Sequence, residues 1–294
     1  MMLQAGSKLE THGRSDPGLA RKILRFTKIE HTAFSLPLVL AGAWIGTEGR
    51  TPPISILLLI IVATAGARIF GMSFNRIFDR RIDALNPRTA IRELPSGILS
   101  VNTALMVAFA GLAVYISACA TLGGWCLILS PLPLIPLLGY SLLKRFTSLC
   151  HFGIGVCLAM APLGAFVATS GHLGFSPMVI WLSLFVFLWL SGADIIYAIM
   201  DIEADRTHHI HSIPARFGRA GALKIAALCH LSAFGCLVAV FSHTNGGPGT
   251  GAAMVISTAA MAAMYLPSIP LGFRFFPIAT IAGIAAALVP ILGY

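Results

Sequence analysis

Long apolar stretches constrain this chain more than any other feature of its sequence. A bilayer core is about 30 Å thick, so a helix needs about 20 mainly apolar residues to cross it. Stretches of roughly this length recur along the chain and leave no room for a separate soluble domain. We place about nine of them, near residues 32–48, 53–76, 100–121, 124–143, 149–170, 177–200, 219–241, 251–270 and 275–293.

These stretches predict an all-α membrane protein of about nine transmembrane helices in one bundle. A helix satisfies its own backbone polar groups, which lipid cannot do. A β-barrel would instead show alternating segments of about ten residues. Only 11% of the residues are charged, against about a quarter in a soluble domain. We expect a polar N-terminal tail over residues 1–27 and a single transmembrane domain over 28–294.

The distribution of charge predicts an orientation in the membrane. The net charge is +9, and Lys and Arg gather before the first stretch and in every second connection after it. The connections at 121–124, 169–174 and 243–251 contain no Lys or Arg. By the positive-inside rule, the N-terminus and the basic loops face the cytoplasm. Because the cations alternate with membrane spans, we expect no nucleic-acid partner.

Acidic residues concentrate in two segments on the predicted cytoplasmic face, and the first covers residues 67–97. Asn75, Asp79 and Asp83 are spaced four residues apart there, so they lie on one face of a helix. Arg68 lies seven residues before Asn75, on the same stripe.

The second acidic segment covers residues 194–218 and repeats the pattern. Asp201 and Asp205 are also four residues apart. Asp194 and Tyr197 precede Asp201 by seven and four residues and share its face of a helix.

Two such acidic pairs at matching depth predict a divalent cation. Like charges four residues apart repel on a helix, and the repulsion grows near a medium of low dielectric constant. Carboxylate and amide oxygens are hard ligands, and Mg²⁺ is usually held by one or two carboxylates together with substrate phosphates. Cations in the following loops could reach such a phosphate: Arg88, Arg92, Lys144, Arg145, Arg206 and Arg216.

A local explanation competes with the functional one. Arg80, Arg81 and Arg206 could pair with the neighbouring acids as a solvated helix end. Acids at membrane helices are by default functional candidates, and the two matched segments favour a shared binding site. His208, His209 and His211 suggest a transition-metal site at first sight, but they lack a ligand spacing.

At this point the residues resemble a known family. The Asn-x-x-x-Asp-x-x-x-Asp run at 75–83, followed by NPRT and RELPSG, resembles the first signature of the UbiA superfamily of intramembrane prenyltransferases. DIIYAIMDIEAD with HSIPARFG resembles the second, and YSLLKRFT resembles the Tyr and Lys-Arg loop between them. One departure is Asn75-Arg76, where many 4-hydroxybenzoate enzymes have Asn-Asp.

The resemblance implies membrane enzymes of the same helix count, built around a central cavity with a lateral opening for a long tail. Such enzymes transfer a prenyl chain from an allylic diphosphate to an acceptor, commonly an aromatic ring. The resemblance further implies that the diphosphate is bound through Mg²⁺ by five residues: Asn75, Asp79, Asp83, Asp201 and Asp205.

The remaining site residues are assigned by hypothesis. Arg68 and Tyr197 are expected at the acceptor, with Arg68 holding its carboxylate or, alternatively, pairing with an acid such as Asp79. Asp194 could orient the acceptor or take the proton that the ring loses. Glu30 and His31 could line the acceptor pocket or pair at a helix end.

The function implied is transfer of a polyprenyl chain to an aromatic acid such as 4-hydroxybenzoate in quinone biosynthesis. The motifs resemble most closely a bacterial branch, which implies an inner (cytoplasmic) membrane. That branch leaves prenylation of a dihydroxynaphthoate in menaquinone biosynthesis as an alternative. Polyprenyl diphosphate, the aromatic acid and the lipid bilayer are the expected partners.

Three other functions are alternatives. The main one is a transporter, because charges and broken helices also mark transport pathways. Against it, the acids here cluster at helix ends on one side, away from the midplane. A membrane phosphotransferase would also use Mg²⁺ and Asp, but such an enzyme usually shows a single compact acidic run. A prenyltransferase acting on haem or chlorophyll is disfavoured by RELPSG and HSIPARFG.

Overall fold

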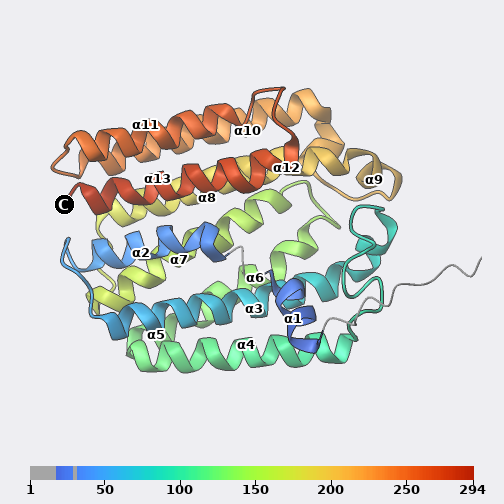
Figure 1. Cartoon of the computed structure of the whole chain (residues 1–294), viewed down its shortest axis with the longest axis horizontal. Coiled ribbons are helices and arrows are strands. Elements are labelled where there is room, and N and C mark those ends of the chain that lie inside the picture. The colour runs from blue at the N-terminus through green and yellow to red at the C-terminus, as the bar shows by residue number, and fades with distance from the viewer. Residues whose placement is uncertain (1–17, 29–31) are drawn as a thin grey trace, which may run out of the picture.

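The computed structural model describes residues 18–28 and 32–294, and within these ranges the chain is helical and contains no strand. The long helices lie side by side, with their axes along the longest axis of the molecule (Figure 1). The predicted all-α fold is therefore confirmed.

Ten helices carry the apolar stretches. In chain order they are α2 (Thr32–Gly46), α3 (Ile54–Leu85), α4 (Val101–Leu122), α5 (Gly124–Leu129), α6 (Pro131–Leu143), α7 (Cys150–Ser170), α8 (Pro177–Ala198), α10 (Ile213–Ser242), α11 (Pro248–Ala263) and α13 (Ala279–Leu292). Shorter segments lie at their ends: α1 (Leu19–Thr27), η2 (Ile199–Asp201), α9 (Ile202–Thr207), α12 (Leu271–Phe273) and η3 (Arg274–Ile278).

The predicted count of nine spans is not confirmed, although each predicted stretch contains a helix. Seven helical runs in the described residues are long and apolar enough to cross a membrane. The other two, α2 and α11, have 15 and 16 residues, fewer than the roughly 20 that a full crossing needs.

The apolar stretch at 53–76 ends where charged residues begin, and α3 continues beyond it to Leu85. This continuation confirms the helix expected at Asn75, Asp79 and Asp83. One other stretch differs from the prediction. The stretch at 124–143 is divided at Ser130, where α5 ends and Pro131 opens α6. Proline has no N–H to donate, so it fits the first turn of a helix better than its interior.

The main hydrophobic core surrounds α8, which packs against α7 and α10. Leu182, Phe185 and Trp189 of α8 are fully buried. A second close contact joins α2 to α7, where a Cβ on Gly42 would lie 2.3 Å from the carbonyl oxygen of Pro162. Small residues at such crossings let membrane helices approach closely.

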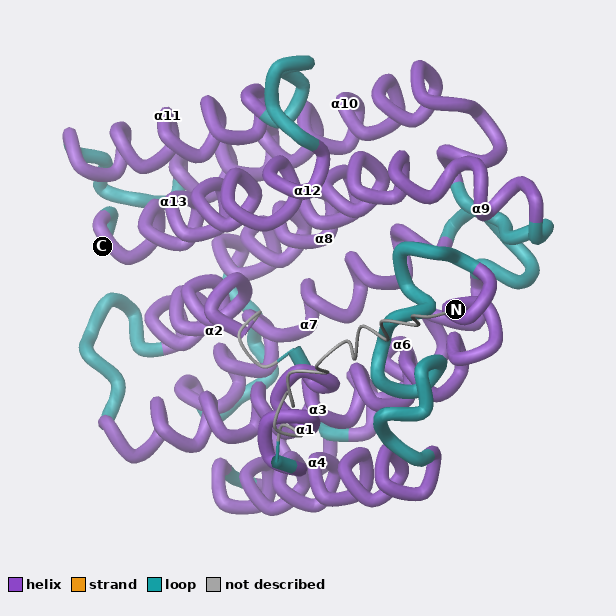
Figure 2. The backbone as a smooth tube through the Cα atoms, turned by 45° about the vertical axis from the view of Figure 1, so that its right-hand side comes forward, coloured by secondary structure: helices purple, strands orange, loops and turns teal. Residues whose placement is uncertain are grey.

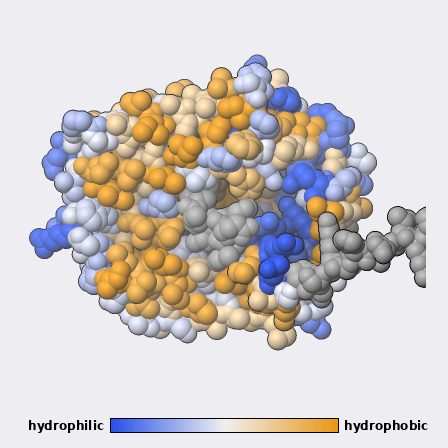
Figure 3. All heavy atoms as spheres, viewed as in Figure 1, coloured by the Kyte–Doolittle hydropathy of each residue, from blue (hydrophilic) through white to orange (hydrophobic). Residues whose placement is uncertain are grey.

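The loops that carry the two acidic segments lie at the same end of the bundle. The loop between α3 and α4 and the segment from η2 through α9 lie beside each other at the right of Figure 1, and Figure 2 gives the same arrangement. The face shown in Figure 3 is mainly hydrophobic along its middle, and hydrophilic residues gather toward the ends of the long axis. This distribution matches a multi-pass membrane protein.

Helix α1 occupies the end of the predicted N-terminal tail. Phe26 of α1 is fully buried against Leu94, Leu99 and Ala104. The helix therefore packs on the same end of the bundle as the loop that follows α3.

We expect Gly42→Ala to destabilise the protein and Gly164→Ala to leave it unharmed. Alanine favours a helix over glycine by about 1 kcal/mol, but at Gly42 the new methyl group meets the Pro162 backbone, and overpacking costs about 1–3 kcal/mol. Gly164 of α7 has open space around it. The apparent melting temperatures in detergent, measured by tryptophan fluorescence, check this; equal values for both variants would contradict the α2–α7 contact.

Candidate active site

The two acidic segments meet directly, although they are more than 100 residues apart in the sequence. Asn86 Nδ2 of the α3–α4 loop donates to Asp201 Oδ1 at 2.7 Å. Arg88 donates from Nε to Asp201 Oδ1 at 2.9 Å and from Nη2 to Oδ2 at 2.6 Å. A guanidinium that binds both oxygens of a carboxylate fixes distance and orientation together. The loop after the first segment is thus fastened to the second.

In the first segment, a cation from a loop reaches each buried carboxylate. Asp79, whose side chain is 4% exposed, lies 2.7 Å from Lys144 Nζ, and Asn75 Nδ2 donates to it at 3.1 Å. Asp83, 5% exposed, accepts from Arg92 Nη1 at 2.7 and 2.9 Å. An ionised carboxylate in such surroundings requires a partner, and here the loop cations supply it.

The second segment combines the Arg88 fork with neutral donors. Arg88 Nη1 also donates to the Tyr197 hydroxyl at 3.0 Å, and its guanidinium carbon lies 5.2 Å from the centre of that ring. Asp205 accepts from the Ser212 hydroxyl at 2.7 Å. Ser212 also accepts from the Ala215 N–H as the N-cap of α10, so one serine joins the acid to the start of the next helix.

Local hydrogen bonds determine how the α3–α4 loop presents its cations. Asn86 Oδ1 accepts from the Arg88 N–H at 2.9 Å, a turn that asparagine forms readily. Thr89 Oγ1 donates to the Asp83 carbonyl at 2.9 Å. The residues of the NPRT sequence therefore fold back on the end of α3, and this fold positions Arg88 over the second segment.

The corner between α6 and α7, residues 144–149, contacts both acidic segments. Lys144 reaches Asp79 through its side chain, and its carbonyl accepts from the His211 N–H at 2.8 Å. Arg145 Nη2 donates to the Phe78 carbonyl near the end of α3 at 2.6 Å. This α6–α7 corner holds the first segment and the loop after the second in one arrangement.

Asp194 lies on α8, about 10 Å along the helix from Asp201. Its Oδ2 atom is 2.7 Å from His151 Nδ1, and its side chain is 23% exposed. His151 Nε2 in turn accepts from the Ile213 N–H at 3.3 Å. Asp194 is therefore held apart from the two acidic pairs.

The structure brings together Asn75, Asp79, Asp83, Arg88, Arg92, Lys144, Asp201 and Asp205 at one end of the bundle. Two predicted residues have other immediate neighbours. Arg68 Nε donates to the Lys28 carbonyl at 3.3 Å, and Tyr197 contacts Arg88, a predicted diphosphate ligand. Glu30 and His31 lie outside the described residues.

Three residues of the site were not predicted from the sequence: Asn86, His151 and Ser212. Each binds an aspartate that lies far from it or beyond a turn, and local spacing does not reveal such a contact.

Arg76 was predicted only to be a departure from the related motif. Arg76 is 5% exposed, and its Nε and Nη1 atoms have no hydrogen-bond partner in the described part of the chain. A buried guanidinium beside the acids adds positive charge to this site.

The residues present fit Mg²⁺, although they form no ready-made cage for it. Within residues 18–28 and 32–294 no group of three His, Cys, Asp or Glu side chains is placed to hold a metal. Loop cations bind Asp79, Asp83 and Asp201. The Oδ1 atom of Asp79 is nevertheless buried with no partner among the described residues. A hard oxygen ligand left over in an acidic site suits Mg²⁺, which needs only one or two carboxylates when phosphates complete its shell.

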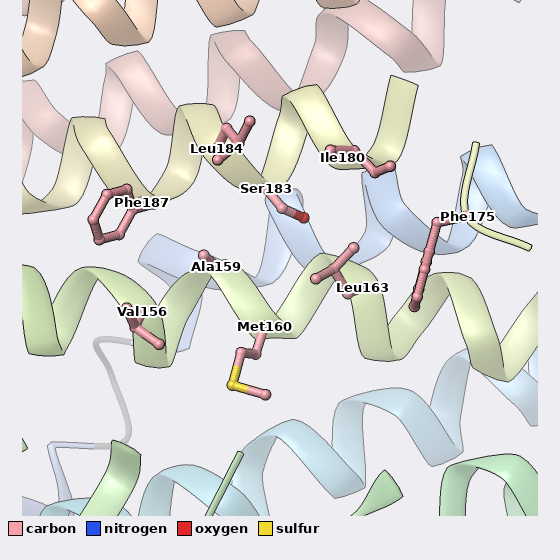
Figure 4. A pocket seen from close by; sticks show the side chains of 9 residues that line it. All are labelled: Val156, Ala159, Met160, Leu163, Phe175, Ile180, Ser183, Leu184 and Phe187. Atoms are coloured by element: carbon pink, nitrogen blue, oxygen red, sulfur yellow. The ribbon is translucent and has the colours of Figure 1, made fainter. Parts of the chain in front are cut away.

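A separate apolar pocket of about 400 Å³ opens between α7 and α8. Figure 4 shows its side chains, which come from these two helices and include Phe175 of the loop between them. The pocket contains no ionisable residue, so it offers space to an apolar chain and takes no part in acid–base chemistry.

Comparisons of this chain with known proteins all indicate the same family. Residues 35–269 match the UbiA prenyltransferase family. A 4-hydroxybenzoate octaprenyltransferase of Coxiella burnetii is 32% identical over 209 residues, which cover 70% of this chain and 71% of that protein. The enzyme of the same name from Aliivibrio salmonicida is 28% identical over 238 residues, covering 78% and 82%.

Solved structures agree with this result. The apo structure of a UbiA homolog from Aeropyrum pernix K1 superposes with a TM-score of 0.78 at 32% identity, over 90% of this chain and 97% of that one. A UbiA homolog from Archaeoglobus fulgidus bound to GPP and Mg²⁺ shares the fold, with a TM-score of 0.68 at 21% identity over 92% and 99%.

We expect Lys144→Met to destabilise the protein and Asp79→Asn to recover much of that loss in the double variant. Methionine keeps the length of the side chain but leaves Asp79 as a buried charge without its cation. An unsatisfied buried group costs about 1–3 kcal/mol, whereas an asparagine carries no charge to compensate. Melting temperatures of the two single variants and the double variant in nanodiscs measure the coupling, and strictly additive effects would contradict the ion pair.

Proposed function

We propose that this chain, which belongs to the UbiA prenyltransferase family, transfers a polyprenyl chain from an allylic diphosphate to an aromatic acid of the 4-hydroxybenzoate type. The observation that carries the proposal is the meeting of two acidic segments through Asn86, Arg88 and Asp201. One diphosphate between them would contact both. The relatives named 4-hydroxybenzoate octaprenyltransferase support the choice of acceptor.

We assign the metal to the predicted acidic residues. Those that would hold it are Asn75, Asp79, Asp83, Asp201 and Asp205. Mg²⁺, when bound there, supplies positive charge that stabilises the leaving diphosphate. The Archaeoglobus fulgidus homolog bound to GPP and Mg²⁺ supports this assignment at the level of the fold.

The loop cations have two possible partners in this proposal. Lys144, Arg92 and Arg88 neutralise Asp79, Asp83 and Asp201 respectively. A diphosphate offers oxygens that bind guanidinium and ammonium groups at least as well as carboxylate does. Substrate binding would therefore turn these cations from the carboxylates toward the phosphates and release carboxylate oxygens for metal. Arg145 would act indirectly, by holding the α6–α7 corner against α3 through the Phe78 carbonyl.

The transfer itself needs charge stabilisation, placement and a base. As the allylic C–O bond breaks, negative charge grows on the diphosphate, where Arg88, Arg92 and Lys144 stabilise it. The ring carbon beside the acceptor hydroxyl attacks the allylic carbon and then loses its proton, for which Asp194 is our candidate base. Arg68 would hold the acceptor carboxylate. Exclusion of water by the bundle would prevent capture of the allylic cation as an alcohol.

We place the acidic segments on the cytoplasmic side of a bacterial-type inner membrane, following the positive-inside rule. The polyprenyl tail would then lie in the bilayer while the acceptor arrives from the cytoplasm. Prenylation of a dihydroxynaphthoate in menaquinone biosynthesis would use the same residues, because it has the same bond changes at a different ring.

The test is an assay of the protein in nanodiscs with Mg²⁺ and a long-chain prenyl diphosphate. We expect a prenylated product from 4-hydroxybenzoate, detected by mass spectrometry, and its loss with EDTA. Asp79→Ala and Asp201→Ala should each lower turnover at least about 100-fold, the usual scale for removing a transition-state contact.

The parallel reaction with 1,4-dihydroxy-6-naphthoate distinguishes the two acceptors. Product from the naphthoate alone would replace the proposed acceptor and keep the reaction. Absence of product from both acids in folded protein, or full activity in EDTA, would contradict the proposal, and substrate flux without a covalent product would indicate a transporter.

A further inference from the structure

His151 is hydrogen bonded to Asp194 at one end of α7, and we propose that it is a positioning residue that holds Asp194 as the base for the ring proton. This inference rests on the function proposed above and extends it to a residue outside both acidic segments. The contact is short, with 2.7 Å between His151 Nδ1 and Asp194 Oδ2.

The tautomer of His151 follows from its second contact. The Ile213 N–H can only donate, and it points to His151 Nε2 at 3.3 Å. A ring nitrogen that accepts a hydrogen bond carries no proton, so the proton of a neutral imidazole is on Nδ1. Nδ1–H therefore donates to Asp194, and the aspartate is the acceptor.

Burial makes this arrangement rigid. The His151 side chain is 4% exposed, and both of its nitrogens are engaged. The imidazole is fixed between α8 and the first residue of α10, since Ile213 begins α10. One carboxylate oxygen of Asp194 is thus held in place, while the 23% exposed side chain keeps access to a ligand and to solvent.

Asp194 differs from the other aspartates of the site in its partner. Asp79, Asp83 and Asp201 each bind a guanidinium or ammonium group from a loop. In the described part of the chain, Asp194 has the His151 imidazole as its side-chain partner. Asp205 has the Ser212 hydroxyl as its partner and lies four residues beyond Asp201 along the chain.

The position of Asp194 along α8 suits the reacting ring. It precedes Asp201 by seven residues, which is about 10 Å deeper in the bundle. A diphosphate held at the level of Asp201 directs its allylic carbon inward, so the acceptor ring lies between the diphosphate and the membrane interior.

The proposed step balances as follows. The ring carbon beside the hydroxyl forms a bond to the allylic carbon, and the C–O bond electrons leave with the diphosphate. The C–H electrons of that ring carbon then restore aromaticity, and its proton goes to the Asp194 carboxylate. The proton leaves the protonated side chain to solvent after product release. His151 neither gains nor loses a proton in this sequence.

The experiment measures kcat for wild-type and variant proteins in nanodiscs, with 4-hydroxybenzoate and with the same acid deuterated at both ring carbons beside the hydroxyl. His151→Leu removes the donor to Asp194 and keeps an apolar side chain. His151→Asn keeps an amide donor near the position of Nδ1 but loses the acceptor for Ile213. We expect kcat to fall about 10- to 100-fold in His151→Leu, the usual cost of losing a residue that orients an active group.

The isotope effect separates positioning from structure. With the base misplaced, C–H cleavage becomes rate-limiting, so a primary isotope effect on kcat should appear in His151→Leu, while in wild type it stays near unity. His151→Asn should recover most of the rate and lose the isotope effect. Asp194→Asn should show the same isotope effect, and adding His151→Leu to it should cost little more, because the two residues act as one unit.

A matched control is His230→Leu. His230 on α10 is equally buried and also has both nitrogens engaged, with the Trp189 carbonyl at 3.1 Å and the Tyr265 hydroxyl at 2.7 Å. Its loss perturbs the core without touching Asp194, so no isotope effect should appear.

Two results would overturn the inference. A rate loss in His151→Leu with the isotope effect still near unity, or with the same loss in His151→Asn, would reduce His151 to a structural contact. If wild-type protein makes no product from 4-hydroxybenzoate, the proposed acceptor fails and the base role for that acceptor fails with it. If wild-type protein makes product but His151→Leu loses rate without an isotope effect, the positioning role alone is rejected and the proposed function stands.

Discussion

The arrangement of this end of the molecule depends on the cost of burying carboxylates beside a membrane interior. Asp79 and Asp83 are almost fully buried near the end of α3, where an unpaired charge would be strongly unfavourable. Each carboxylate therefore binds a cation from a loop: Asp79 binds Lys144 of the α6–α7 corner, and Asp83 binds Arg92 of the α3–α4 loop. The loops fold over the helix ends because the acids need them, so an electrostatic requirement determines the shape of the site.

The same requirement couples the two halves of the chain. Arg88 leaves the first half to bind Asp201 in the second, and the α6–α7 corner reaches Asp79 on one side and His211 on the other. Such cross-contacts hold two acidic segments that are far apart in sequence at one end of the bundle, where the proposed function places one ligand between them. They also give Asp79, Asp83 and Asp201 a cation each, and in the proposed function a diphosphate and its metal would bind by exchanging these partners.

Hydropathy predicted most of the fold, because the length of a lipid-facing helix equals the length of its run of apolar residues. It failed where other forces decide. Full spans were predicted at α2 and α11, which are helices too short to cross alone. The spacing of Asn75, Asp79 and Asp83 predicted a common face because helix geometry is local. The partners of those residues were not predictable, since Arg88 and Asp201 meet only through the tertiary fold. His151 gave no signal, because a single histidine in an apolar stretch does not reveal what it contacts.

The central claim is that Asp79, Asp83, Asp201 and Asp205 hold one diphosphate between them while the loop cations change partners. A structure of the protein in nanodiscs with Mg²⁺ and geranyl thiolodiphosphate, which resists cleavage, tests it most directly. We predict metal density between the two acidic segments, with the Arg88 and Arg92 guanidiniums moved from Asp201 and Asp83 to phosphate oxygens. A diphosphate bound elsewhere, or bound while Arg88 still holds both oxygens of Asp201, would contradict the account.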